Sequence, residues 1–256
     1  MSPAARSYVV TGGGRGVGRA VVERLLADGH AVVAVELDPA AADGLPAAAV
    51  VAGSAADESV AEEAADRAGA LAPLAGWVNN AAIFRDAALH ADGAGAVLDL
   101  VTANLAPAVV GTAVAVRRFL TAGTGGAIVN VSSHQAARPV RGALPYSVAK
   151  AAVEGLTRAT AVEYGPGGIR ANAVALGSIE TARYTELLAG LDPAAAAEVR
   201  AQMRRLHPLG RVGRAAEVAA VVAHLLSDES SFVSGATVPV DGGRAVLGLD
   251  PEATDG

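Results

Sequence analysis

The sequence predicts a doubly wound α/β domain, with a mostly parallel sheet covered by helices on both faces. Three observations carry this prediction: apolar runs alternate with stretches of helical spacing, a glycine-rich turn follows the first run, and no low-complexity linker divides the 256 residues. Parallel strands joined by right-handed crossovers leave few other arrangements for such alternation. We therefore expect one domain over residues 1–256, with a seven-stranded sheet.

Strands and helices are expected in turn along most of the chain. Apolar runs predict strands at residues 7–11, 31–36, 47–52, 75–79, 127–131, 170–175 and 236–240. Helical spacing predicts helices at residues 17–29, 57–70, 97–120, 146–164 and 214–226. The alternation breaks at residues 176–209, where one helix is expected near residues 193–205. We interpret residues 176–209 as a substrate-binding flap, and the tail after residue 250 as loose.

Composition excludes several classes of protein. With 52% hydrophobic and 18% charged residues, the chain can bury a large core and does not resemble a disordered protein. Its net charge of −6 and its lack of a basic tract argue against a nucleic-acid partner. The apolar residues 107–116 end at two arginines, short of the roughly 18 residues of a membrane span. The N-terminus is not signal-like, so we expect a cytoplasmic location and no membrane.

Two residue counts narrow the chemistry. The chain has no cysteine, which excludes thiolate nucleophiles, and its five histidines lack a metal-binding spacing, so no metal site is expected. Of the 20 basic residues, 19 are arginine and one is lysine, Lys150. Where arginine is used in place of lysine almost everywhere, the single lysine either survives by chance or occupies a site that requires a compact ammonium.

The glycine-rich turn at residues 11–18 reads TGGGRGVG and lies between the first expected strand and the first expected helix. At such a turn the free backbone N–H groups and the helix dipole attract a pyrophosphate, and glycines allow its close approach. A tight turn without a ligand is the alternative. The position between strand and helix favours a dinucleotide.

An acidic residue, Glu36, ends the second expected strand 24 residues after Gly12. At about this spacing a carboxylate hydrogen-bonds the adenine ribose hydroxyls and repels a 2′-phosphate, which favours NAD over NADP. Arg15 in the turn is an opposing signal, because a guanidinium there could bind a 2′-phosphate. We give Glu36 the greater weight, with a solvated strand end as the alternative reading and NADP as the possible second cofactor.

Tyr146 and Lys150 are four residues apart, on one face of an expected helix. A tyrosine normally titrates near 10, so proton exchange near neutrality requires a stabilised phenolate. We expect the Lys150 ammonium and an oxidised nicotinamide together to lower the Tyr146 pKa, and the ammonium also to hydrogen-bond the nicotinamide ribose. Ser133, at the end of the fifth expected strand, would bind the substrate oxygen. An exposed Tyr–Lys pair and a capping serine are the structural alternative.

Taken in order, these motifs resemble the short-chain dehydrogenase/reductase family over residues 11–243. The resemblance rests on TGxxxGxG at 11–18, NNAA at 79–82 for the family's NNAG, Asn104, Ser133, YxxxK at 146–150, GSIET at 177–181, and the segments 208–211 and 240–243. The serine and the tyrosine are 13 residues apart, as in the family. Ala82 in place of glycine and Leu176 in place of the proline of PGxxxT depart from the pattern without touching a reacting group.

The resemblance implies a Rossmann-fold oxidoreductase that transfers a hydride between a nicotinamide cofactor and a secondary alcohol or ketone. The implied catalytic residues are Asn104, Ser133, Tyr146 and Lys150, with Asn104 holding a water that relays protons through Lys150. The implied cofactor-binding residues are Gly12, Arg15, Gly16, Val17, Gly18, Glu36, Asn80, Ala81, Tyr146, Lys150, Gly177, Ile179 and Thr181. The family also implies a homotetramer, paired through the two long helices at 97–120 and 146–164.

The substrate is less well marked than the reaction. His134 and Gln135 follow Ser133 directly and are expected to line the substrate site, together with Tyr184 of the flap. Arg183 adds a charge to that lining. A catalytically silent dinucleotide sensor or interaction protein is the alternative function, but such a protein would not need the four implied catalytic residues together. The partner is therefore expected to be a small alcohol or ketone.

Overall fold

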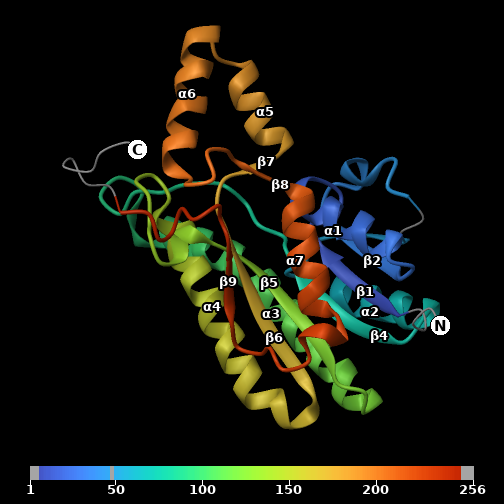
Figure 1. Ribbon diagram of the computed structural model, residues 1–256. Coiled ribbons are helices and arrows are strands. Elements are labelled where there is room, and N and C mark those ends of the chain that lie inside the picture. The colour runs from blue at the N-terminus through green and yellow to red at the C-terminus, as the bar shows by residue number, and fades with distance from the viewer. Residues whose placement is uncertain (1–5, 47–48, 249–256) are drawn as a thin grey trace.

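The protein is described by a computed structural model that places residues 6–46 and 49–248. Its main sheet has seven strands in the order β3-β2-β1-β4-β5-β6-β9 (Figure 1). They are β1 (Ser7–Thr11), β2 (Ala31–Glu36), β3 (Ala49–Ala52), β4 (Leu74–Asn79), β5 (Gly126–Ser133), β6 (Ile169–Leu176) and β9 (Thr237–Val240). All neighbouring strands are parallel, which confirms the doubly wound sheet. The first two residues of the expected third strand, and the tail, lie outside the described residues.

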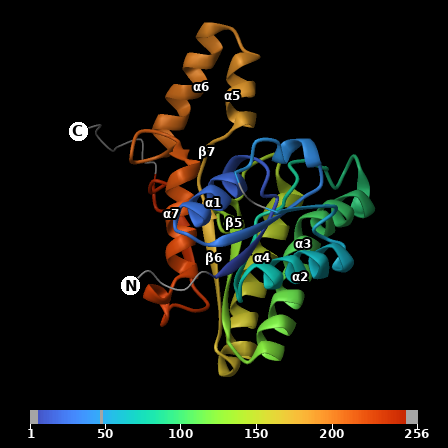
Figure 2. The same ribbon diagram turned by 90° about the vertical axis from the view of Figure 1, so that its right-hand side faces the viewer.

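Helices cover both faces of this sheet (Figure 2). One face carries α1 (Gly16–Ala27) and α7 (Ala215–Leu226), which pack against each other. The other face carries α2 (Glu58–Leu71), α3 (Gly93–Ala122) and α4 (Leu144–Tyr164). Four short 3-10 helices join elements at residues 39–42, 134–136, 165–167 and 228–230.

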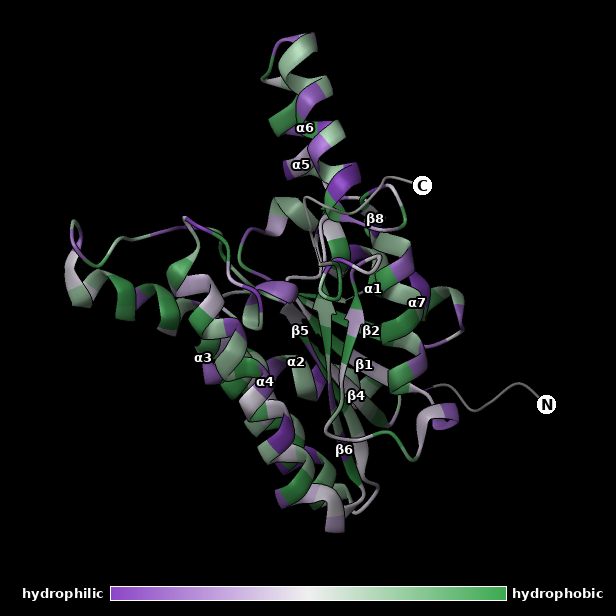
Figure 3. Ribbon diagram, turned by 60° about the vertical axis from the view of Figure 1, so that its left-hand side comes forward, coloured by the Kyte–Doolittle hydropathy of each residue, from purple (hydrophilic) through white to green (hydrophobic). Residues whose placement is uncertain are grey.

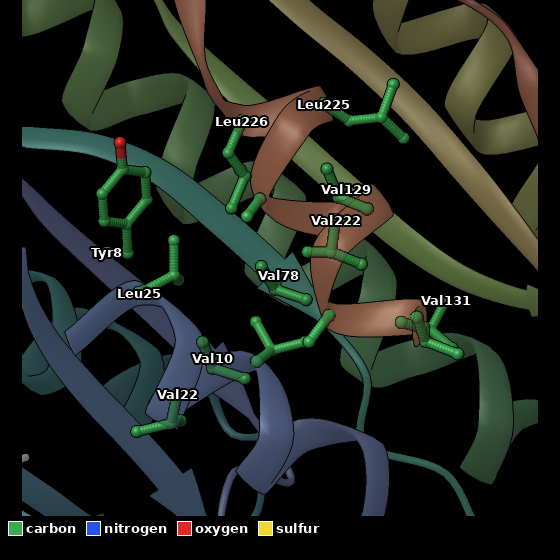
Figure 4. Packing of buried hydrophobic residues seen from close by; sticks show 14 of the residues in the cluster. Tyr8, Val10, Val22, Leu25, Val78, Val129, Val131, Val222, Leu225 and Leu226 are labelled. Carbon is green, nitrogen blue, oxygen red and sulfur yellow. The ribbon is translucent and has the colours of Figure 1, made fainter. Parts of the chain in front are cut away.

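Alternate strand residues supply the two halves of the core, because successive side chains of a strand point to opposite faces. Val10 packs in one cluster with residues of α1 and α7, and Figure 4 shows Val22, Leu25 and Val222 in the same cluster. Val9, its neighbour, packs on the other face with residues of α2 and α3. Strands buried on both faces explain why the sequence shows continuous apolar runs rather than alternation.

The strand order reverses at β1, which lies between β2 and β4. The chain leaves β1 toward β2 and β3, and then returns to the other side of β1 as β4. The carboxyl ends of β1 and β4 therefore open a crevice, the usual ligand position in such sheets. The glycine-rich turn lies at this crevice because it follows β1 directly.

The flap contains two helices, so the expectation of one helix is wrong. After β6 the chain forms β7 (Ile179–Glu180), α5 (Ala182–Ala189), α6 (Pro193–Leu206) and β8 (Gly213–Arg214), and β7 pairs with β8. Helix α5 has only eight residues and none of them is buried, so it is too short for apolar spacing to predict it. Figure 1 shows α5 and α6 standing away from the sheet. Leu176, expected in the flap, is instead the buried last residue of β6.

Helix α3, with 30 residues, is long and apolar enough to cross a membrane by length and composition alone. In the fold it packs against β4, α2 and α4 as a core helix. Arg117 and Arg118 near its end form ion pairs with Glu62 of α2. The helix therefore has packing partners within the fold on its β4, α2 and α4 sides.

Candidate active site

The glycines of the turn are required by backbone geometry. Gly12 has a φ of +62°, a left-handed conformation that favours glycine. A Cβ on Gly18 would lie 2.0 Å from the carbonyl oxygen of Gly12. A residue with a Cβ does not fit at position 18, because the start of α1 packs directly against the backbone of the turn. The turn is therefore a close-packed cradle whose backbone is open to a ligand.

Thr11 and Asn80 hold this turn in place across the crevice. The Thr11 hydroxyl accepts hydrogen bonds from the backbone N–H groups of Asn80 (3.0 Å) and Ala81 (3.1 Å). The Asn80 amide donates to the carbonyl oxygens of Thr11 (3.1 Å) and Gly12 (3.0 Å). Asn80 and Ala81, which are predicted to contact the cofactor, thus form hydrogen bonds with residues of the glycine-rich turn. The sequence predicts Thr11 only as part of the motif, because its hydroxyl contacts depend on the pairing of β1 with β4.

The first turn of α1 fits a pyrophosphate. Arg15 precedes the helix and supplies no side-chain acceptor to its N-terminal N–H groups, which leaves them available to an anion. A Cβ on Gly16 would lie 3.5 Å from the Thr181 methyl group, so the start of the flap faces the turn. Val17 is half-buried against the core, and its backbone belongs to the same first turn.

Gly177 and Ile179 lie where the flap leaves the sheet. Gly177 donates its N–H to the Val240 carbonyl at 3.1 Å, and a Cβ there would come within 2.8 Å of the Asp241 Cα. Ile179 pairs with Gly213 in the two-stranded sheet that closes the base of the flap. Both residues therefore fix the path of the chain toward Thr181.

Glu36 is buried beside the turn, which rules out the solvated strand end. One carboxylate oxygen accepts the N–H of Gly14 at 3.0 Å, and the other accepts the N–H of Leu37 at 3.0 Å. The side chain is only 6% exposed. Arg15 is exposed and forms no ion pair with Glu36, and residues 37–42 contain no basic side chain. The edge of the crevice at β2 is therefore acidic.

Ser133, Tyr146 and Lys150 meet at the carboxyl end of β5. Ser133 ends the strand, and its hydroxyl accepts the N–H of Gln135 at 3.2 Å. The Lys150 ammonium is buried, lies 5.5 Å from the centroid of the Tyr146 ring and donates to the Val131 carbonyl at 2.7 Å. The structure thus brings together three residues that the sequence placed on one strand end and one helix face.

Burial dominates the pKa values of this group. It raises the pKa of Tyr146 to about 12, while the nearby Ser133 hydroxyl and the Arg183 charge act to lower it. Burial also lowers the pKa of Lys150 to about 8. The Lys150 ammonium donates to a backbone carbonyl here and is not among the groups that lower the Tyr146 pKa, so its expected effect with a bound nicotinamide stays a prediction.

The buried ammonium should cost stability. Folded Lys150 loses its proton near pH 8 and an unfolded lysine near 10.5, so the unfolded state binds more protons between these values and wild-type stability rises with pH there. Lys150→Met should raise the free energy of unfolding at pH 7 by up to about 3 kcal/mol. Urea unfolding at fixed protein concentration measures this. The stability advantage of Lys150→Met over wild type should disappear between about pH 8 and 10.5. If the variant were less stable than wild type at pH 7, the buried ammonium would not be destabilising.

Asn104 is buried in α3 and does not hydrogen-bond to Lys150 within the described residues. Its side-chain oxygen accepts the N–H of Ile83 at 2.9 Å, and its amide donates to the Leu100 carbonyl at 3.0 Å. It therefore ties the loop after β4 to α3. That loop carries Phe84.

Phe84 and Arg183 form a stack over Tyr146 that the motifs did not reveal. The rings of Phe84 and Tyr146 have centroids 5.0 Å apart, and the Arg183 guanidinium lies 4.3 Å from the Phe84 centroid. The two residues come from the loop after β4 and from α5, so the stack joins the flap to the opposite side of the site. No periodicity or motif marks them, although Arg183 falls in the predicted flap.

The expected substrate residues separate into two places. His134 and Gln135 lie beside Ser133, and the Ser147 hydroxyl donates to the Gln135 side chain at 3.4 Å. Tyr184 instead lines a cavity between α5 and α6, with Leu188 and Met203 among its walls. Neither Ser133 nor Tyr146 lines that cavity. The flap residue next to the tyrosine of the site is thus Arg183, one position earlier.

Comparison with known proteins gives consistent matches over nearly the whole chain. A family model described as enoyl-(acyl carrier protein) reductase matches residues 12–245. Levodione reductase of Leifsonia aquatica is 34% identical over 94% of both chains. Cis-4-hydroxycyclohexanecarboxylate dehydrogenase of Sinomonas cyclohexanicum is 40% identical over 95% of this chain and 98% of that protein. The ligand-free aldohexose dehydrogenase of Thermoplasma acidophilum superposes with a TM-score of 0.87 at 28% identity, covering 98% of each chain.

Proposed function

The chain belongs to the short-chain dehydrogenase/reductase family, and on this premise we propose that Tyr146 is the acid and base of its reaction. The protein is an oxidoreductase that transfers a hydride between a nicotinamide cofactor and an alcohol or ketone. One observation carries the assignment of Tyr146: its phenol lies with Ser133 and Lys150 at the carboxyl end of β5, beside the crevice of the glycine turn.

Each of the three residues has one task. In alcohol oxidation the hydroxyl proton passes to the Tyr146 phenolate as the C–H hydride leaves, and in ketone reduction the phenol returns the proton to the forming alkoxide. The nicotinamide accepts or supplies the hydride when bound. Ser133 binds the reacting oxygen, and Lys150 supplies a positive charge that the phenolate requires. The proposed water-holding role of Asn104 stays a prediction, and its observed contacts make it a positioning residue for the loop of Phe84.

The substrate class is proposed as a secondary alcohol or ketone small enough to lie between Tyr146 and the flap at residues 176–209. His134 and Gln135 would contact it from the side of Ser133. A relative named for cis-4-hydroxycyclohexanecarboxylate makes ring alcohols the first candidates. Nicotinamide absorbance with a panel of cyclic alcohols and ketones tests the proposal, and absence of turnover with an intact cofactor complex would favour the silent sensor instead.

NAD is the proposed cofactor, because the buried Glu36 carboxylate lies where an adenine ribose would extend from the turn. We expect a higher kcat/KM with NAD than with NADP. Glu36→Gln keeps an acceptor for the Gly14 N–H but removes the charge, so it should reduce this preference about tenfold or more. Initial rates with both cofactors measure it. Arg15→Gln is the matched control. If the wild type preferred NADP and Arg15→Gln abolished that preference, Arg15 rather than Glu36 would determine the choice of cofactor.

A homotetramer is proposed from the outer surface of α3 and α4. Figure 3 shows long hydrophobic parts on both helices, and Val109 and Val162 are exposed there, whereas Val114, Val116 and Val153 are core residues. Exposed apolar residues on neighbouring helices favour pairing with a second copy. Sedimentation at micromolar concentration should give four chains, and a monomer would contradict this proposal.

The cytoplasmic location also stays a prediction.

A further inference from the structure

Three polar residues follow adjacent strand ends next to Ser133 at the carboxyl edge of the sheet. In the strand register Ser133 pairs with Leu176, and Leu176 pairs with Val240, so the ends of β5, β6 and β9 lie next to each other. The segments after these ends carry His134, Ser178 and Arg244. The Arg244 guanidinium donates to the Ser178 hydroxyl at 2.6 Å.

Arg244 is a half-buried cation without an acidic partner. Within residues 6–46 and 49–248 it forms no ion pair. The carboxylate of Asp241 lies nearby, but its oxygens accept the backbone N–H groups of Gly243 (2.9 Å) and Ala245 (2.7 Å). Burial lowers the pKa of Arg244, and the Asp241 charge only partly opposes this. Most of the guanidinium donors are therefore left for an acceptor from outside the protein.

His134 offers a second donor in the same place. Its side chain is 7% exposed, and its ring forms no hydrogen bond with the described residues. Burial and the Arg244 charge lower its pKa to about 4, with Asp241 acting against them, so the ring is neutral at pH 7. The neighbouring His207 does not compete, because its two nitrogens contact the Met203 carbonyl (2.7 Å) and the Ser178 N–H (3.2 Å).

We propose that Arg244 and His134 bind a carboxylate of the substrate while Ser133 and Tyr146 hold its reacting oxygen. This inference rests on the proposed function for the position of the reacting oxygen. One guanidinium charge beside a neutral imidazole matches a monoanion, and the planar fork of arginine suits a carboxylate. The substrate class is then a hydroxy acid or oxo acid rather than a neutral alcohol.

Binding tests the subsite without turnover. Cyclohexanecarboxylate and its neutral analogue cyclohexanecarboxamide are titrated calorimetrically into the full chain saturated with NAD. Wild type should bind the carboxylate at least about tenfold more tightly than the amide, and Arg244→Gln should remove this difference. Ser178→Ala is the control, because it removes the neutral partner of Arg244 but keeps the charge, and it should keep most of the preference. Arg244→Lys keeps the positive charge but lacks the planar guanidinium, so it should lose part of the preference for the carboxylate. This variant replaces Arg244→Gln in the test if the glutamine variant does not fold.

Equal affinity of wild type for the two probes would overturn the subsite. The subsite would also be overturned if the Arg244 and Ser178 variants lost affinity for both probes equally, because Arg244 would then only support the structure. Carboxylate-selective binding without turnover of any alcohol would leave the subsite standing and overturn the proposed reaction. When turnover is present, kcat/KM for cis-4-hydroxycyclohexanecarboxylate should exceed that for its methyl ester, and Arg244→Gln should reduce this ratio mainly through KM.

Discussion

Tyr146→Phe is expected to abolish turnover at every pH, with a loss of at least about 10³-fold in kcat. Phenylalanine fills the same space between Phe84 and Lys150 but has no proton to exchange. The loss should therefore appear in kcat while the protein still folds and binds NAD. Nicotinamide absorbance gives the rates, and calorimetric titration gives the NAD affinity.

Tyr164→Phe is the matched control for this variant. Tyr164 ends the same helix, α4, and packs against the core on the far side from the site. It should keep near-normal turnover. If Tyr146→Phe retained more than about a tenth of the wild-type rate, another group would have to be the acid and base, since losing a general acid normally costs far more.

Lys150→Arg is expected to lower activity by orders of magnitude at pH 7 even though the charge is kept. Lys150 is fully enclosed, with its ammonium 2.7 Å from the Val131 carbonyl and 5.5 Å from the Tyr146 ring centroid. A guanidinium is larger and planar, and it cannot direct a compact charge to two oxygens from that position. Burial raises the pKa of Tyr146 to about 12 in the protein alone, so its phenolate has to be stabilised in the cofactor complex, and a displaced charge there should leave the phenol protonated.

The pH profile separates this effect from a packing defect. Residual activity of Lys150→Arg should climb toward about pH 10, because more phenolate forms as the solution approaches the raised pKa. A packing defect would lower the rate by the same factor at each pH. Circular dichroism and urea unfolding check that the variant is folded, and near-normal turnover at pH 7 would refute the role given to the only lysine.

Much of the framework was determined by the sequence alone, because its signals are local. The strands that form the sheet are continuous apolar runs, and Gly12 and Gly16 of the turn at residues 11–18 are required by their own left-handed backbone conformation. Tyr146 and Lys150 are one helical turn apart, so their common face follows from the helix period. Ser133 joins them because parallel strands end at the same edge.

Features that depend on distant segments or on burial could be seen only in the three-dimensional fold. The strand order brings His134, Ser178 and Arg244 to three adjacent strand ends, and the path of the flap places Arg183 on Phe84. Helix α5 spans only eight residues and buries none of them, so its apolar spacing was too short to predict it. The raised pKa of Tyr146 likewise follows from desolvation by residues far apart in the chain, which residue spacing does not encode.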